Sequence, residues 1–318
     1  MMRVPAIYRM TGICSVMHLL VDGICVCCLY LMASSVTQIV GIFITYNVLA
    51  FMTQPLTGMW ADKLERKHWM LLASVLLLTL AVLATSVVMS VECWSVGMPV
   101  VAVLLGAGNS LFHVWGGKTV AVGTGNDIRA LGTFVATGAF GLSLGVVYFS
   151  WPLLYLLLLS YCLLSIASLH GDGSLSTTDP ADVAGFSRMF VLLSLTAIIA
   201  AVVLRSFISE TFSIGLPKNN TMVLLAGALS MLGKMAGGWI ARQWGIVKAL
   251  VMMLLVLAAC FLFRSQGTIV LLAALFAVNC TMPVTLYLAN VVLPGREGLA
   301  FGLLAAALVP GYLLAFIL

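Results

Sequence analysis

Long apolar stretches, each close to twenty residues, follow one another along almost the whole chain. A helix needs about 20 mainly apolar residues to cross the hydrocarbon core of a bilayer. The stretches do not alternate apolar with polar positions, as the strands of a membrane barrel do. They therefore predict an all-α polytopic membrane protein with eleven spans, near residues 10–32, 36–60, 69–90, 96–120, 129–149, 151–170, 188–210, 219–241, 246–263, 267–291 and 297–317.

Composition agrees with a chain whose solvent is lipid. Hydrophobic residues fill 63% of the 318 positions and charged residues only 8%, whereas a soluble domain carries about 25% charged residues. The net charge of +5 is scattered rather than arranged in a stripe, so we expect no nucleic-acid partner. The cysteines lie mostly in apolar runs, where packing explains them better than disulfides or a metal site. No phosphate loop, metal-ligand spacing or nucleophile motif is present, so we expect neither a cofactor, nor a metal, nor an enzyme.

Basic residues predict how the chain lies in the membrane, because Lys and Arg collect in cytoplasmic loops. With the N-terminus inside, the outer loops hold only Lys218 and Arg264. We therefore expect a multi-pass protein of the cell (inner) membrane with a cytoplasmic N-terminus. The cytoplasmic side then collects Arg3, Arg9, Lys63, Arg66, Lys67, Arg129, Arg188, Arg242, Lys248 and Arg296.

The longest polar stretch, residues 170–187, follows the sixth apolar run and is rich in Gly, Ser, Thr and Asp. This composition is typical of a loop, and its position favours a linker between two bundles. We expect a six-helix bundle over 1–170, a cytoplasmic linker over 171–187 and a bundle of about five helices over 188–318.

The two sides of this linker resemble each other. Gly58 and Ala61 end the second run as Gly238 and Ala241 end the eighth, at an offset of 180 residues. Asn109 in the fourth run corresponds to Asn279 in the tenth, at an offset of 170. Internal repeats of this kind are usual in secondary transporters, so the pattern suggests duplicated halves.

The segment 58–67, Gly-Met-Trp-Ala-Asp-Lys-Leu-Glu-Arg-Lys, lies between the second and third runs. It resembles the loop that joins helices 2 and 3 in the major facilitator superfamily, with Glu65 where a second glycine is usual. The resemblance implies a pseudo-symmetric fold of two helical bundles. Members normally have twelve helices; this chain has eleven runs, so helix 12 is apparently absent. The matching positions are Gly58, Asp62, Lys63, Arg66 and Lys67.

A narrower resemblance rests on His18 and Asp22 in the first run and on residues 112–116 in the fourth. Both look like the fosmidomycin-resistance branch of exporters, with Val114 and Trp115 standing where that branch has Pro and Glu. The missing Glu removes one acidic group that the branch normally has at this position.

Ionisable groups within the runs are the first candidates for function, because a charge at the bilayer centre costs roughly 2.5–3.5 kcal/mol. His18 and Asp22 lie four residues apart, on one helix face. With His113 in the fourth run they suit a proton-coupling site. The alternative is a structural polar pair that fixes the first helix against a neighbour.

Four further polar residues are candidates for substrate binding. Asn109 shares a helix face with His113, and Lys118 either contacts substrate or anchors the end of its helix. Arg205 is suited to an anionic group but could instead pair with Glu210 or reach outward. Lys234 has a substrate role or a structural tie as alternatives. The uncharged Asn47, Gln54, Asn279 and Asn290 are more typical of contacts between helices.

The loop after the second run is a candidate gate. Asp62 can accept charge-assisted hydrogen bonds from an arginine or a helix N-terminus, and Arg129 is one partner that we expect. The predicted gating set is Gly58, Asp62, Lys63, Arg66, Lys67 and Arg129; the alternative is a basic loop that only sets orientation. Glycines at 132, 138, 141 and 145 predict close helix packing in the fifth span.

These features lead us to expect a secondary active transporter, a proton-coupled exporter of a small organic molecule that works as a monomer by alternating access. Its partners would be the substrate, protons and the lipid bilayer. A membrane protein that kept the fold without transporting, as a receptor-like or assembly partner, is the alternative. A cavity lined by Asp22, His18 and His113 favours transport, and a collapsed apolar centre favours the alternative.

Overall fold

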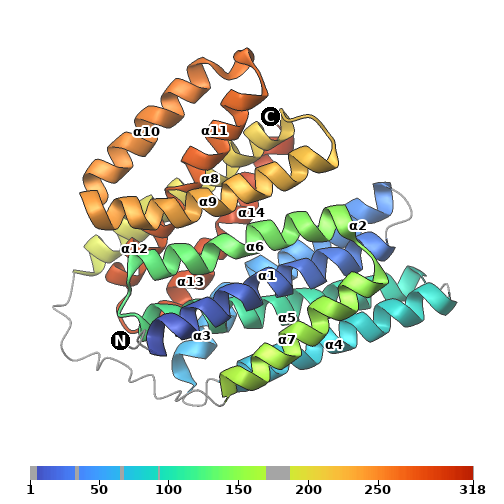
Figure 1. Cartoon of the computed structure of the whole chain (residues 1–318). Coiled ribbons are helices and arrows are strands. Elements are labelled where there is room, and N and C mark those ends of the chain that lie inside the picture. Colours follow the sequence, from blue (N-terminus) through green and yellow to red (C-terminus); the bar gives the residue numbers. More distant parts are fainter. Residues whose placement is uncertain (1–5, 33–35, 65–67, 92–93, 170–186, 318) are drawn as a thin grey trace, which may run out of the picture.

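The computed structural model describes residues 6–32, 36–64, 68–91, 94–169 and 187–317. Every regular element in these ranges is helical (Figure 1). Residues 171–186 of the predicted linker and the gate residues Arg66 and Lys67 lie outside the described residues. The elements are α1 (Ala6–Met32), α2 (Val36–Asn47), η1 (Val48–Met52), α3 (Gln54–Lys63), α4 (His68–Val91), α5 (Trp94–Gly123), α6 (Ile128–Tyr148), α7 (Trp151–Leu169), α8 (Arg188–Ile214), α9 (Asn220–Trp244), α10 (Ile246–Leu262), η3 (Arg264–Gln266), α11 (Thr268–Asn279), α12 (Met282–Val292), α13 (Glu297–Ala306) and α14 (Leu308–Ile317).

The apolar runs become membrane-spanning helices. In the described ranges, nine helices are long and apolar enough to cross a bilayer, and α10 is a shorter apolar helix. The second run also folds as a helix, but η1 divides it into α2 and α3. The prediction of an all-α polytopic protein is therefore confirmed, with boundaries that move by a few residues.

The helices form two bundles, α1–α7 and α8–α14, which we call the N-terminal and C-terminal bundles. The most extensive contacts between them join α6 to α9 and α3 to α13. Figure 1 shows α9 running alongside α6 for much of its length. These two seams place side chains from both bundles around one centre.

Glycines make both seams close, and they occur at equivalent places. At the α3–α13 seam, a Cβ on Gly58 would overlap the backbone of Gly298. At the α9–α6 seam, a Cβ on Gly238 would lie 2.6 Å from the carbonyl oxygen of Ile128. Gly58 and Gly238 are 180 residues apart and Ile128 and Gly298 are 170 apart, the same two offsets that the sequence repeat has. The duplicated pattern thus corresponds to two matching helix seams.

Three spans change their helix geometry part-way along their length. The second contains the π-helical turn η1, the tenth is divided between α11 and α12, and the eleventh is divided at Ala307 between α13 and α14. Residues next to each break, Phe51, Met282 and Leu308, line the same central cavity. Single π-helical turns inside α-helices frequently occur at functional sites.

Replacing Gly58 by Ala should destabilise the protein, because the added methyl group meets the backbone of α13. Overpacking of this kind costs about 1–3 kcal/mol, which should appear as a lower midpoint of thermal unfolding in detergent. Gly12→Ala is the matched control, since a Cβ there meets nothing within 4 Å. An alanine in an exposed helix is favoured over glycine by up to about 1 kcal/mol, so Gly12→Ala should not lower the midpoint. Equal effects of the two substitutions would contradict the seam.

Candidate functional site

A buried carboxylate, Asp22 on α1, is the centre of the site. His18 precedes it by one helical turn, and the His18 Nε2 atom lies 3.3 Å from Asp22 Oδ2. Both residues are about 5% exposed. A carboxylate removed from water needs partners to compensate its charge, and the surrounding helices supply them.

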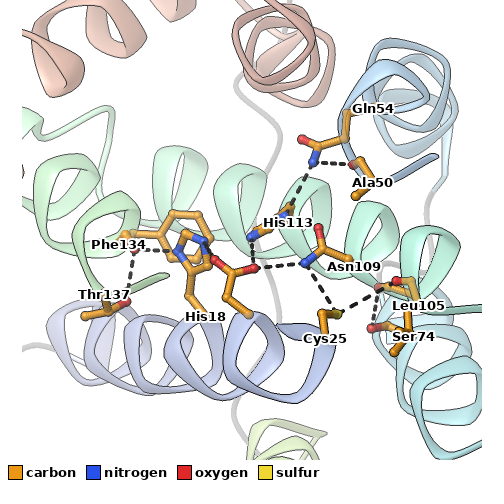
Figure 2. A network of polar contacts seen from close by, with 12 residues as sticks. His18, Cys25, Ala50, Gln54, Ser74, Leu105, Asn109, His113, Phe134 and Thr137 are labelled. Atoms are coloured by element: carbon orange, nitrogen blue, oxygen red, sulfur yellow. Dashed lines mark hydrogen bonds and ion pairs between the residues drawn. The ribbon is translucent and has the colours of Figure 1, made fainter. Parts of the chain in front are cut away.

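Helix α5 brings two further groups to Asp22. Asn109 Nδ2 donates a hydrogen bond of 2.9 Å to Asp22 Oδ1, and His113 Nε2 lies 3.3 Å from the same oxygen. Asn109 and His113 share one face of α5, as their spacing predicts. Figure 2 shows His18, Asn109 and His113 pointing toward one another from two helices. The three residues predicted for proton coupling therefore converge.

The hydrogen bond behind His18 decides where its ring carries a proton. Nδ1 lies 2.7 Å from the backbone carbonyl oxygen of Phe134 on α6, and a carbonyl oxygen only accepts, so Nδ1 donates. In the neutral ring Nε2 is then bare and faces a carboxylate oxygen. That approach is attractive only when one proton lies on His18 Nε2 or on Asp22 Oδ2. The pair is therefore built to hold a single shared proton.

A second chain of contacts orients His113. Gln54 Nε2 donates to the carbonyl oxygen of Ala50 at 2.8 Å and lies 3.4 Å from His113 Nδ1 (Figure 2). This contact holds the His113 ring with its Nε2 atom facing Asp22. Gln54 has a role beyond the general contact between helices that the sequence suggests.

Gly138 on α6 closes the other side of the His18–Asp22 pair. A Cβ at this position would overlap both Asp22 Oδ2 and His18 Nε2. The glycine-rich pattern predicts close packing in this span, but it does not reveal that a glycine lies directly against the ionisable pair. Any larger residue at 138 would have to displace the pair.

A cavity of about 150 Å³ lies between the two bundles. His18, Asp22 and His113 line it from the N-terminal bundle, and Arg205 and Lys234 line it from the C-terminal bundle. Arg205 is 7% exposed, and its Nε atom has no hydrogen-bond partner. The remaining lining is mainly apolar, from Phe51, Gln54, Val135, Ala139, Leu142, Met282, Thr285, Leu286, Phe301, Leu304, Ala305 and Leu308.

The residues predicted for substrate binding separate into two groups. Arg205 and Lys234 line the cavity. Asn109 is fully buried behind Asp22, where it positions the carboxylate, and it is not among the lining residues. Lys118 lies elsewhere: its Nζ atom is 3.0 Å from Asp62 Oδ1 and donates to the carbonyl oxygen of Ala61 at 3.0 Å.

Asp62 joins three helices at the end of the α3–α13 seam. Its carboxylate accepts hydrogen bonds from the backbone N–H groups of Gly298 and Leu299, each at 2.9 Å, in the first turn of α13. A helix N-terminus carries free N–H groups and partial positive charge, which suit a carboxylate. Lys118 on α5 adds an ion pair. Asp62 thereby ties the N-terminal bundle to the C-terminal bundle.

Arg129 is not the partner of Asp62 in this structure. It binds Asp127, the N-cap of α6, through a contact of 2.6 Å from Nη2 to Oδ2. The Arg129 guanidinium holds the pKa of the Asp127 carboxyl below its usual value, so the cap stays charged near neutral pH. Its guanidinium also lies 5.3 Å from the ring centroid of Trp239 on α9, a cation–π contact between the bundles. Lys63 is exposed beside Asp62.

A further contact between the bundles was not expected from the sequence. Asn126, in the turn between α5 and α6, accepts a 2.8 Å hydrogen bond from Asn290 Nδ2 on α12 and donates to the carbonyl oxygen of Tyr287. Asn126 adopts a left-handed conformation, with φ 61°, which asparagine tolerates better than most residues. This turn geometry could have been suspected from Gly125-Asn126, but its partner could not.

The donor atoms of His18, Asp22 and His113 lie within 4.8 Å of one another, so these residues could also hold a metal ion. Two imidazoles and a carboxylate suit several transition metals. The spacing along the sequence does not reveal this set, because it comes from two helices. Arg205 and Lys234 share the cavity, and their positive charges oppose a divalent cation there.

Comparison with solved structures establishes the fold. The E. coli fucose:proton symporter is similar with a TM-score of 0.67 at 14% identity, covering 98% of this chain and 90% of that chain. The human organic anion transporter TETRAN gives a TM-score of 0.65 at 18% identity, covering 98% and 93%. A bacterial homologue of the iron transporter ferroportin, in an outward-facing state, gives 0.61 at 13%, covering 97% and 91%.

At these identities the likeness concerns the fold, and the chain has the major-facilitator fold that the loop after its second span implies. No sequence-family profile matches the chain. No curated protein matches its sequence.

Lys118→Met should lower the stability of the protein, because Asp62 would lose its buried ion-pair partner. Removing one member of a buried pair costs about 3–5 kcal/mol. The double variant Lys118→Met/Asp62→Asn should recover a large part of this loss, since no uncompensated carboxylate remains. Thermal unfolding of the four proteins in a double-mutant cycle measures the coupling; strictly additive effects would contradict a direct pair.

Proposed function

We propose that this protein is a secondary active transporter that moves a small organic molecule across the membrane by alternating access, coupled to protons. The observation that carries the proposal is the buried contact of His18 with Asp22 beside a cavity between the two bundles. A buried group that gains or loses a proton changes the electrostatic free energy of each bundle arrangement. Proton-coupled alternating access needs such a group beside the cavity that both bundles line.

The contacts of Asp62 support a gate on one side of this cavity. Asp62, Lys118 and the N-terminus of α13 hold the bundles together at the end where we place the cytoplasm. Arg129 with Trp239 and Asn126 with Asn290 add contacts between the bundles. We infer that this arrangement is closed toward the cytoplasm and that the opposite arrangement breaks these contacts. Gly58 serves the gate by allowing the close seam.

Export from the cell is the direction that the resemblance to the fosmidomycin-resistance branch implies, and we propose it with an inner-membrane location, a cytoplasmic N-terminus and a monomeric state. A non-transporting protein with the same fold would have no need of an open centre. The cavity between ionisable residues of both bundles favours transport over that alternative.

Asp22→Asn should abolish pH-driven flux, because the amide cannot share the proton with His18. The measurement is flux in proteoliposomes under an imposed pH gradient, with compounds that the unaltered protein transports. A coupling carboxylate acts by gaining and losing a proton, which an amide cannot do. We therefore expect the remaining flux to be independent of the pH gradient rather than merely slower.

Glu210→Gln is the matched control for this experiment. It removes another carboxylate within a spanning helix, α8, but one that does not line the cavity. The control should keep the dependence on the gradient. If Asp22→Asn behaves like Glu210→Gln, the coupling role of Asp22 is wrong.

Asp62→Asn should shift the balance between the two bundle arrangements, because the charge-assisted bonds to α13 and Lys118 are lost. Bonds to charged groups are worth about 1.5–3 kcal/mol, which changes a two-state ratio by roughly tenfold or more. Spin labels placed at the exposed positions Lys63 and Arg296, in a cysteine-free background, report the distance between the bundles at this end. In Asp62→Asn a larger fraction of molecules should show the longer distance than in the unaltered protein. An unchanged distance distribution would mean that Asp62 only sets the orientation of the loop.

A further inference from the structure

The charges around the cavity do not balance. Asp22 is the only acidic residue among the described residues that line it. Its charge is compensated by His18, His113 and Asn109. Within the described residues, Arg205 and Lys234 therefore face the cavity without an ion pair to any carboxylate.

No other acidic residue in the described part of the chain forms an ion pair with Arg205 or Lys234. Asp62 pairs with Lys118, Asp127 pairs with Arg129, and Glu297 accepts from the backbone of Gly295. Glu210, which the sequence offers as a partner for Arg205, makes no ion pair with it. Arg205 and Lys234 make neither an ion pair nor a side-chain hydrogen bond within the described ranges, and Arg205 Nε is buried without a partner.

Two cations that line one cavity without an ion-pair partner are costly in the interior of a membrane protein. Burial removes the water that would stabilise each charge, and the two like charges repel. Such an arrangement is retained where a ligand supplies the missing charge. Arginine in particular presents a planar set of donors that matches a carboxylate or a phosphonate in two parallel hydrogen bonds.

We propose that the cavity binds a small organic anion, whose acidic head group lies between Arg205 and Lys234 and whose apolar body lies against Phe51, Phe301 and Leu304. The inference deepens the proposed transport function by naming the substrate class. A volume of about 150 Å³ is comparable to an apolar cavity that accepts a benzene ring in another protein. The head group can be a carboxylate, phosphonate or sulfonate, since all three share the charge and acceptor geometry.

The division of labour between the bundles follows from this placement. The N-terminal bundle supplies the proton site and the C-terminal bundle supplies the anion site, and both face one volume. A ligand that contacts both sides senses which arrangement the bundles adopt. A divalent metal on His18, Asp22 and His113 is the competing occupant, and the two nearby cations disfavour it.

Three probes of one shape test the proposal on the purified full-length protein in detergent. Benzoate, benzamide and benzamidine have the same ring and carry a negative, a neutral and a positive group. Binding followed by tryptophan fluorescence or calorimetry should rank benzoate at least tenfold above benzamide, with no binding of benzamidine. Arg205→Gln and Lys234→Gln should each weaken benzoate binding by roughly 10- to 100-fold.

Matched controls separate a binding role from a structural one. Lys218→Gln removes an exposed cation outside the cavity and should leave benzoate binding unchanged. Arg205→Lys keeps the charge and should retain part of the affinity. Because Arg205 is an unpaired buried charge, Arg205→Gln should also raise the unfolding midpoint of the ligand-free protein. A lowered midpoint would assign Arg205 to a structural contact and overturn its proposed role.

Several results would overturn the proposal as a whole. Benzoate that fails to bind, or three probes that bind equally, would mean that charge does not select the ligand. Zn²⁺ that binds in place of benzoate, and is lost in His113→Ala, would assign the cavity to a metal cation.

The outcome is separable from that of the transport proposal. Charge-selective binding without any flux in proteoliposomes would defeat transport and keep the anion site. Flux that depends on Asp22, without charge-selective binding, would keep the transport proposal and defeat the anion site.

Discussion

The need to compensate charge away from water is the constraint on which this structure depends. Asp22 can remain ionisable inside the helix bundle only because His18, Asn109 and His113 surround it, and these groups in turn require α1 and α5 to pack closely. Phe134 and Gln54 then fix the two imidazoles from further helices. One carboxylate thereby determines contacts among four spans, and the N-terminal bundle is organised around it. The C-terminal bundle leaves its two central cations open to the cavity.

The seams between the bundles depend on the absence of side chains rather than on charged groups. Backbone-to-backbone approach at Gly58–Gly298 and at Gly238–Ile128 needs glycine on at least one partner. Close contact of this kind replaces the hydrophobic driving force that lipid does not supply between spanning helices. Polar contacts such as Asp62 with the N-terminus of α13 add direction to these seams. They can be exchanged for water when the bundles separate, whereas a glycine contact simply opens.

Much of this architecture could be predicted from the sequence, since spans depend on apolar length and charges mark the few positions that lipid disfavours. Asp22, His18 and His113 are predictable because ionisable residues are conspicuous in apolar runs. The expectation that Arg129 pairs with Asp62 is wrong, because proximity to the same end of the molecule does not decide between Lys118 and Arg129. The roles of Gln54 and Gly138 cannot be predicted from the sequence, since they depend on which atom of another helix lies beside each residue. The breaks in the second and tenth spans coincide with polar residues and a proline, Thr53–Pro55 and Asn279–Pro283. A count of apolar residues spans these positions, so it does not reveal that the helix geometry changes there.

The three helix breaks allow the walls of the cavity to move in parts. The second, tenth and eleventh spans each change geometry beside the cavity, at Phe51, Met282 and Leu308. An unbroken helix behaves as a stiff rod, so tilting one end must displace the other. A helix with a break at its middle can tilt on one side of the break while the half on the other side keeps its contacts. With three breaks beside one volume, the outer halves of these spans can move around a bound molecule while the Asp62 end keeps its contacts.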